Sequence, residues 1–201
     1  QLKDLECHIV AHLEKRLFTE WLPLLKSAQH TLAELDALLA LAVCARDMHL
    51  VKPTLTEDDM GLIQISGGWH PLVASASQAT ASHAPTTLVP NDCEIGSADE
   101  RLMLLTGPNA SGKTVFLRTV AMVVYLAHVG SYVPAEAATV ARTDAIHTRM
   151  HSKESAAVNQ SAFMLDLSQM AAIFKYSTAR SLCLIDEFGK GTNAQDGISL
   201  L

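Results

Sequence analysis

Eight consecutive residues constrain the fold of this chain more than any other feature, because they match the pattern G-x-x-x-x-G-K-[S/T] at every position. A short apolar run at residues 101–105 leads into the first glycine, and an apolar helical stretch follows at residues 113–128. A buried parallel strand, a glycine-rich turn and a helix, in that order, are the context in which this pattern forms a phosphate-binding loop. The eight residues are Gly107, Pro108, Asn109, Ala110, Ser111, Gly112, Lys113 and Thr114.

The residue types of this loop suit a chain of phosphates bound with Mg²⁺. Glycines allow the backbone to wrap around phosphates with its N–H groups pointing inward, and the N-terminus of the following helix adds partial positive charge. The ammonium group of Lys113 can neutralise the β- and γ-phosphates, and the hydroxyl of Thr114 can ligate Mg²⁺. A chance glycine-rich turn is the alternative, and the correct flanks on both sides weigh against it.

A second apolar run, residues 181–185, ends in two acids, Asp186 and Glu187. In a parallel sheet the carboxyl ends of neighbouring strands face one crevice, so we expect both acids beside the glycine-rich loop. Asp186 suits a water-mediated hold on Mg²⁺, and Glu187 suits orienting and polarising an attacking water. An isolated Asp-Glu pair is usually a solvated strand end. Together with the loop it indicates a Walker B pair, and the glutamate favours a hydrolase over a small-molecule kinase.

The first part of the chain predicts helices. Apolar residues recur at spacings of three and four through residues 1 to about 50. Pro23 interrupts this pattern and is expected to end or kink the first helix. We expect the α-helical segment to occupy residues 1–60 and a second domain to occupy residues 61–201.

The second part predicts an α/β domain. Residues 61–65 alternate like a strand and residues 66–68 indicate a turn, whereas residues 74–100 are rich in Ala, Ser and Thr and are expected to form loop or edge structure. The apolar runs that precede the loop and the acid pair then alternate with helical stretches at residues 113–128 and 161–176. This alternation predicts a layered α/β fold with a parallel sheet.

Composition excludes several classes of protein. The net charge of −6 makes this chain by itself a poor surface for gripping a DNA duplex. Its four cysteines are scattered without a Cys-x-x-Cys pair, which excludes a zinc ribbon and favours buried thiols in a reducing compartment. Residues 119–135 lack any charge, but a histidine, a glycine and a proline within them favour a buried helix over a membrane span. The start at Gln1 and the end at Leu201, inside an apolar run, lead us to expect a soluble intracellular fragment.

Ser161 opens the second apolar helix of the α/β part, and two roles are open to it. Serine is a preferred N-cap, because its side chain accepts a hydrogen bond from a backbone N–H of the first turn. The same position can also bind an anion. From spacing alone, capping is favoured.

Several motifs in a fixed order resemble those of the MutS-type ATPases, which are ABC-superfamily proteins of DNA mismatch repair and recombination. These motifs are the glycine-rich loop, Tyr-Val-Pro-Ala at residues 132–135, Ser-Ala-Phe-Met at residues 161–164, and Leu-Ile-Asp-Glu-Phe-Gly-Lys-Gly-Thr-Asn at residues 184–193. Residues 32–38 and 69–72 extend the resemblance over nearly the whole chain from about residue 30. Residues 146–155, 163–167 and 186–192 are most similar to the meiotic MutS homologue five, with a mismatch-repair MutS homologue as the second choice.

The resemblance implies an incomplete P-loop ABC-type ATPase domain within a nucleotide-gated sliding clamp on DNA. Two related subunits would hold two ATP molecules with Mg²⁺ between phosphate loops and opposing serines, and Ser161 would contact the γ-phosphate of the opposite subunit. The family commonly has Thr where this chain has Ala162, which argues against a second hydroxyl contact. The resemblance makes Lys113, Ser161 and Glu187 catalytic, assigns nucleotide binding to the whole loop, and makes Thr114 and Asp186 the metal-holding residues.

Partners and location are also implied by the resemblance. Domains outside this stretch would hold DNA, and the second subunit would be MutS homologue four in a nuclear, meiotic protein. Two functions stay open: a recombination or repair ATPase, favoured by Glu187, and a weakly hydrolysing scaffold that locks a heterodimer around DNA, favoured by Ala162. A P-loop small-molecule kinase is disfavoured, because the arginines after residue 115 are dispersed rather than gathered in a lid.

Overall fold

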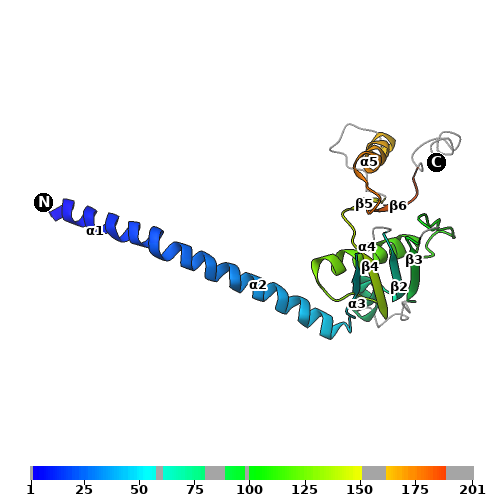
Figure 1. Cartoon of the computed structure of the whole chain (residues 1–201), viewed down its shortest axis with the longest axis horizontal. Helices are drawn as coiled ribbons and strands as arrows, with labels where there is room; N and C mark the ends of the chain where they lie inside the picture. The colour runs from blue at the N-terminus through cyan, green and yellow to red at the C-terminus, as the bar shows by residue number, and fades with distance from the viewer. Residues whose placement is uncertain (1, 58–60, 80–88, 98–99, 151–161, 189–201) are drawn as a thin grey trace. The chain divides into compact units, whose positions relative to one another are not determined.

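The computed structural model describes residues 2–57, 61–79, 89–97, 100–150 and 162–188 (Figure 1). The chain divides into two compact units, Gln1–Cys44 and Ala45–Leu201. The described part of the first unit is helical, and the second unit combines helices with strands. The predicted class, a helical segment followed by an α/β domain, therefore agrees with the structure. The sequence places the domain boundary at residue 60, whereas the compact units meet within the last turn of the long helix.

A long helical run with one wide turn makes up the first unit. It consists of α1 (Leu2–Arg16), a π-helical turn (Leu17–Trp21) and α2 (Leu22–Asp47). The expectation that Pro23 ends or kinks the first helix is met only in part, because α1 ends at Arg16 and a π-helical turn interrupts the α-helix before the proline, but the helical run continues through Pro23. Proline has no N–H to donate and its ring crowds the preceding turn. The π turn directly before it, in which the Leu22 amide donates to the Leu17 carbonyl, widens the backbone there and lets the helix continue.

The apolar stripe of this helix is exposed. Leu5, Ile9 and Leu13 are 60%, 51% and 57% exposed. By length and composition alone, the helical run Leu2–Asp47 is long and apolar enough to cross a membrane, and 6% of its most apolar window is buried. Long apolar helices also form in soluble proteins, where the apolar stripe packs on other elements. The stripe therefore does not identify a membrane protein.

Four strands of the second unit form a mixed sheet (Figure 1). Its order is β1 (Thr54–Thr56), β4 (Ala137–Ala141), β2 (Ile63–Gly68) and β3 (Asn91–Ile95). β1 and β4 are parallel, but β2 is antiparallel to both of its neighbours, so the predicted parallel sheet is wrong here. β2 also continues through residues 66–68, where the sequence predicts a turn. A bulge between Ile65 and Gly68 lets the strand bend while it stays paired.

Two elements occupy the segment predicted to be loop or edge structure. β3 forms the edge of the sheet, as predicted. α3 (Pro71–Ala79) was not predicted, because its Ala and Ser residues carry no apolar period. Its first residue is a proline, which is favoured there because the N–H that proline lacks would have no partner inside the helix.

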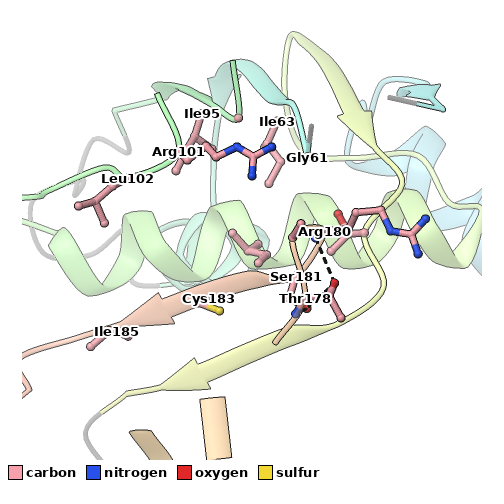
Figure 2. Close-up of a pocket in the computed structure, with 14 residues that line it drawn as sticks. Gly61, Ile63, Ile95, Arg101, Leu102, Thr178, Arg180, Ser181, Cys183 and Ile185 are labelled. Atoms are coloured by element: carbon pink, nitrogen blue, oxygen red, sulfur yellow. Dashed lines mark hydrogen bonds between the residues drawn. The ribbon is translucent and has the colours of Figure 1, made fainter. Parts of the chain in front are cut away.

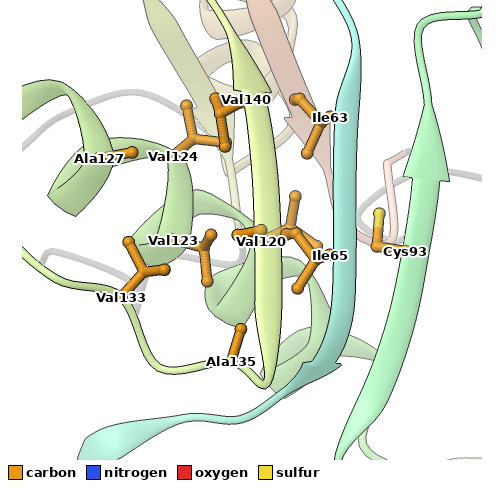
Figure 3. Packing of buried hydrophobic residues seen from close by; sticks show 11 residues of the cluster. Ile63, Ile65, Cys93, Val120, Val123, Val124, Ala127, Val133, Ala135 and Val140 are labelled. Carbon is orange, nitrogen blue, oxygen red and sulfur yellow. The ribbon is translucent and has the colours of Figure 1, made fainter. Parts of the chain in front are cut away.

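The core of the second unit lies between α4 (Lys113–Val129) and the four-stranded sheet (Figure 3). Full burial of each valine or isoleucine side chain contributes about 1.5–3 kcal/mol. Gly130, with a φ of 85°, ends the helix in the left-handed conformation. The buried helix predicted for the charge-free run is confirmed, and its packing fixes the direction of the α4 N-terminus. The cluster contains Ile63, Ile65, Cys93, Val120, Val123, Val124, Ala127, Val133, Ala135, Ala138 and Val140.

A second sheet consists of two parallel strands, β5 (Ile146–Arg149) and β6 (Leu182–Ile185). α5 (Ala162–Tyr176) lies between them in sequence. α5 and β6 confirm the helix and strand predicted at residues 161–176 and 181–185. β5 was not predicted, because Ile-His-Thr-Arg holds a single apolar residue. In the register of this pair, Arg149 lies opposite Ile185, so the two strands end side by side.

Residues 101–105 do not form the strand that the sequence predicts. They have no regular secondary structure, and Leu102 and Leu104 are 88% and 84% exposed. A parallel strand is stable when strands pair with it and other elements cover its faces. The run has the composition of such a strand, but no strand within the described residues pairs with it.

The prediction of buried thiols is right for Cys93 alone. Cys93 on β3 is 5% exposed, and burial raises the pKa of its thiol to about 11. Cys7, Cys44 and Cys183 are exposed. Cys7 and Cys44 lie on the helix of the first unit, where no second described layer covers them.

Candidate functional site

The glycine-rich loop runs directly into α4, as the motif predicts. Lys113 is the first residue of the helix, and its ammonium group donates hydrogen bonds to the carbonyls of Gly107 (2.8 Å) and Pro108 (2.9 Å). Ala110 and Gly112 take left-handed φ values of 63° and 97°. The lysine side chain therefore folds back over the loop and joins its start to the first turn of α4. The N-terminus of α4, where the first backbone N–H groups of a helix have no partner within the helix itself, lies beside the loop.

The acid pair lies next to the loop. The hydroxyl of Thr114 donates to the carboxylate of Asp186 at 2.6 Å, across 72 positions of the chain. Asp186 directly follows β6 and is 8% exposed. The predicted meeting of the loop and the acid pair is therefore present in the structure.

The oxygens of Thr114 and Asp186 fit a magnesium ion. Mg²⁺ prefers hard oxygen ligands, and at phosphate sites it is usually held by one or two carboxylates together with the substrate's own phosphates. A hydroxyl and a carboxylate oxygen 2.6 Å apart match that donor set. Groups of three or more metal-ligating His, Cys, Asp or Glu residues are not found in the described parts of the chain, so a cage made by the protein alone does not form there.

Glu187 faces the same place with an unusual backbone. It lines an open concavity of about 500 Å³, whose other lining residues belong to the loop and the first turn of α4. Its φ is 47°, in the left-handed region that non-glycine residues rarely adopt. A strained residue beside a concavity is typical of a functional position.

The sequence analysis did not identify Arg149, which forms a hydrogen bond with the backbone of the acid pair. Arg149 ends β5, is 1% exposed, and donates from Nη1 to the Asp186 carbonyl at 2.7 Å. Its Nη2 forms an ion pair with the carboxylate of Asp166 on α5, while its Nε finds no partner within the described residues. No local pattern marks this arginine, because its role depends on three elements that are distant in sequence.

Ser161 lies outside the described residues. α5 begins at the next residue, Ala162, so the predicted start of the helix is confirmed. The side-chain roles of Ser161, as an N-cap or as an anion contact, stay predictions.

A separate cavity of about 330 Å³ lies away from the loop (Figure 2). Residues of β2, β3 and β6 line it together with the turn between α5 and β6, and none of the described loop residues takes part. Beside it, Asp144 accepts hydrogen bonds from Thr178 and Ser181, which lower the pKa of this carboxyl group. These bonds hold the α5–β6 turn, and Arg101 and Leu102 also line the cavity. Asp186 and Glu187 lie beside the glycine-rich loop, and none of the described residues that line this cavity is acidic.

The fold and the site together define an α/β protein in which a glycine-rich loop leads into a buried helix and lies next to an acid pair. Residues 103–201 match the family described as MutS domain V. These residues belong to the MutS domain V family, and the likeness to MutS proteins extends over the full length of the chain in some relatives.

Three relatives illustrate the likeness. The chain is 34% identical to a DNA mismatch repair protein MutS of Alkaliphilus oremlandii over 213 aligned residues, which cover 100% of the chain and 23% of that protein. It is 39% identical to a DNA mismatch repair protein MSH3 of Coccidioides immitis, over 84% of the chain and 14% of that protein. It is 36% identical to a DNA mismatch repair protein MutS of Roseiflexus castenholzii, over 100% of the chain and 18% of that protein. The chain thus spans less than a quarter of the length of these relatives.

Proposed function

We propose that this chain is the ATP-binding and ATP-hydrolysing core of a MutS-family protein that acts as a sliding clamp on DNA. The observation that carries the proposal is the 2.6 Å hydrogen bond between Thr114 and Asp186, because it joins a complete phosphate-loop motif to an acid pair. The relatives described above are named as DNA mismatch repair proteins, which supports a role in DNA repair or recombination.

In the proposed reaction a water molecule attacks the γ-phosphorus of ATP, the bond to the β,γ-bridging oxygen breaks, and ADP and phosphate leave. The ammonium group of Lys113 gives up its hydrogen bonds to the two loop carbonyls and bonds to the β- and γ-phosphates instead. Thr114 and Asp186 hold Mg²⁺, which when bound neutralises phosphate charge. Glu187 accepts a hydrogen bond from the attacking water and orients it. The loop N–H groups and the α4 N-terminus stabilise the charge that the phosphates carry.

Within the family we assign the chain to the meiotic branch, MutS homologue five, on the similarity of residues 146–155, 163–167 and 186–192. The proposed partner is MutS homologue four, with Ser161 of each subunit contacting the γ-phosphate bound by the other, in the nucleus. DNA contacts are assigned to other parts of the protein, because this chain carries a net charge of −6.

Purification of the full-length protein from meiotic cells tests the assignment to the meiotic branch. Capture of homologue four supports it, and capture of a mismatch-repair subunit instead contradicts it.

A second candidate function is a scaffold that binds ATP to lock a heterodimer around DNA and hydrolyses it slowly. Ala162 favours it, because a hydroxyl-bearing Thr is common at this place in the family. Single-turnover hydrolysis in the full dimer separates the two functions. A rapid burst of phosphate supports the ATPase, whereas stable ATP occupancy over many minutes supports the scaffold.

Loss of the Lys113 ammonium group tests the site itself. Lys113→Ala removes a charge-assisted contact to phosphate, for which about 1.5–3 kcal/mol is typical, so we expect ATP affinity to fall about 10- to 100-fold. Lys52→Ala, at an exposed lysine outside the loop, is the matched control and should bind ATP like the wild type. Equal ATP affinity of Lys113→Ala and the wild type, measured by calorimetry, would contradict the proposal.

A further inference from the structure

A buried arginine connects α5 with the acid pair. Arg149 is 1% exposed, and Asp166, its ion-pair partner on α5, is 7% exposed. Removing two charges from water is unfavourable, and their mutual attraction offsets this only when the geometry is good and the remaining protons are bonded. Here the Nε proton finds no partner within the described residues. Apolar side chains of similar volume would fill the same space without this penalty, so stability alone does not explain the pair.

The bonds of Arg149 to Asp186 act on the backbone of the acid pair. Nη1 donates to the Asp186 carbonyl at 2.7 Å, and the Asp186 amide donates to the Arg149 carbonyl at 2.8 Å. The Asp186 carbonyl belongs to the same planar peptide unit as the Glu187 N–H. Fixing that carbonyl therefore fixes the orientation of the peptide plane that leads into Glu187.

Glu187 needs this support because its backbone is strained. Its φ of 47° lies in the left-handed region, which is unfavourable for a residue with a Cβ and persists only when the surroundings hold it. In this conformation Glu187 lines the concavity beside the glycine-rich loop. Release of the Asp186 carbonyl would let the peptide relax and turn the carboxylate of Glu187 away from the loop.

We propose that Arg149 is a positioning residue for ATP hydrolysis, which holds the Asp186–Glu187 peptide so that Glu187 faces the nucleotide, and that Asp166 couples this peptide to α5. The inference rests on the proposed ATPase function. Because α5 begins directly after Ser161, a shift of this helix changes the hold of Asp166 on Arg149, and through it the orientation of Glu187.

The test removes both charges together in the full-length, assembled protein. In Arg149→Met/Asp166→Leu, apolar side chains replace the ion pair, an exchange that is often neutral or stabilising. We expect this double variant to bind ATP within about threefold of the wild type and to hydrolyse it about 10- to 100-fold more slowly. Arg149→Lys keeps a cation beside Asp166 but lacks the fork that reaches two partners, so we expect an intermediate kcat with an unchanged KM. Arg142→Met, at an exposed arginine, is the matched control and should retain the wild-type kcat.

A double-mutant cycle that combines Arg149→Lys with Glu187→Gln shows whether Arg149 acts through the glutamate. If it does, Arg149→Lys adds little further loss to Glu187→Gln, because no carboxylate is left to orient. Additive losses in this cycle would overturn the inference. So would wild-type hydrolysis by the double variant, or a fall in ATP affinity as large as the fall in kcat. Absence of ATP hydrolysis by the wild type would instead contradict the proposed function, which keeps the two failures distinct.

Discussion

The hydrogen bond between Thr114 and Asp186 allows a quantitative test of the site. Thr114→Val keeps the shape of the side chain and removes the hydroxyl that donates to the carboxylate at 2.6 Å. Asp186 is 8% exposed, so water can replace the lost donor only in part. A hydrogen bond to a charged group contributes about 1.5–3 kcal/mol, and we expect the free energy of unfolding to fall by this amount.

Urea unfolding of the chain, at a concentration low enough to keep it monomeric, measures this loss. With an m-value of about 2 kcal/mol/M, the midpoint should fall by about 0.7–1.5 M. Thr114→Ser keeps the hydroxyl and should lose much less. Thr119→Val is the matched control, because this buried threonine of the same helix bonds a neutral carbonyl, that of Val115, and its loss should cost about 0.5–1.5 kcal/mol. A wild-type midpoint for Thr114→Val would refute the pairing of the hydroxyl with Asp186.

Three further predictions concern catalysis, pH and the isolated chain. Glu187→Gln should keep its Mg·ATP affinity and lose turnover about 100-fold or more in the full dimer, and a parallel loss of affinity would make Glu187 a metal-holding residue instead. Burial, and secondarily the charge of Arg118, lower the pKa of His70, so the unfolded chain takes up a proton near pH 6.5 before the folded chain does. Stability should therefore fall as the pH drops below 6.5, and His70→Gln should flatten this dependence in urea titrations, whereas an unchanged slope would exclude His70 as its source. The isolated chain should show near-background ATP turnover and self-associate through the exposed run at residues 101–105, and concentration-independent hydrolysis would contradict the role of Ser161 across the dimer.

The features that the sequence predicted well are those encoded by neighbouring residues. The glycine-rich loop has a fixed spacing, and the helix that begins at Lys113 follows it with an unbroken apolar period. β6 is a short apolar run bounded by polar residues, and Asp186 lies near the loop as expected from the rule for parallel strands, although residues 101–105 do not form the neighbouring strand that this rule assumed. Each of these inferences needs only a local pattern and one rule of sheet geometry.

The features that it missed depend on pairing between distant segments. The run at residues 101–105 has the composition of a strand, but strand formation also needs a neighbour, and none within the described residues supplies one. β5 contains polar residues that an isolated strand would not favour, and it forms because β6 pairs with it. Arg149 could not be identified for the same reason, since its contacts come from α5 and the end of β6.

The position of Lys113 has a consequence for how ligand affinity should be interpreted. Its ammonium group donates hydrogen bonds to the carbonyls of Gly107 and Pro108. In the proposed function, these bonds must break before the lysine can bond to a phosphate. In the proposed function, the affinity that this lysine adds is the difference between two sets of bonds. The same two hydrogen bonds hold Gly107 and Pro108 near the start of α4, so this side chain also fixes the shape of the loop.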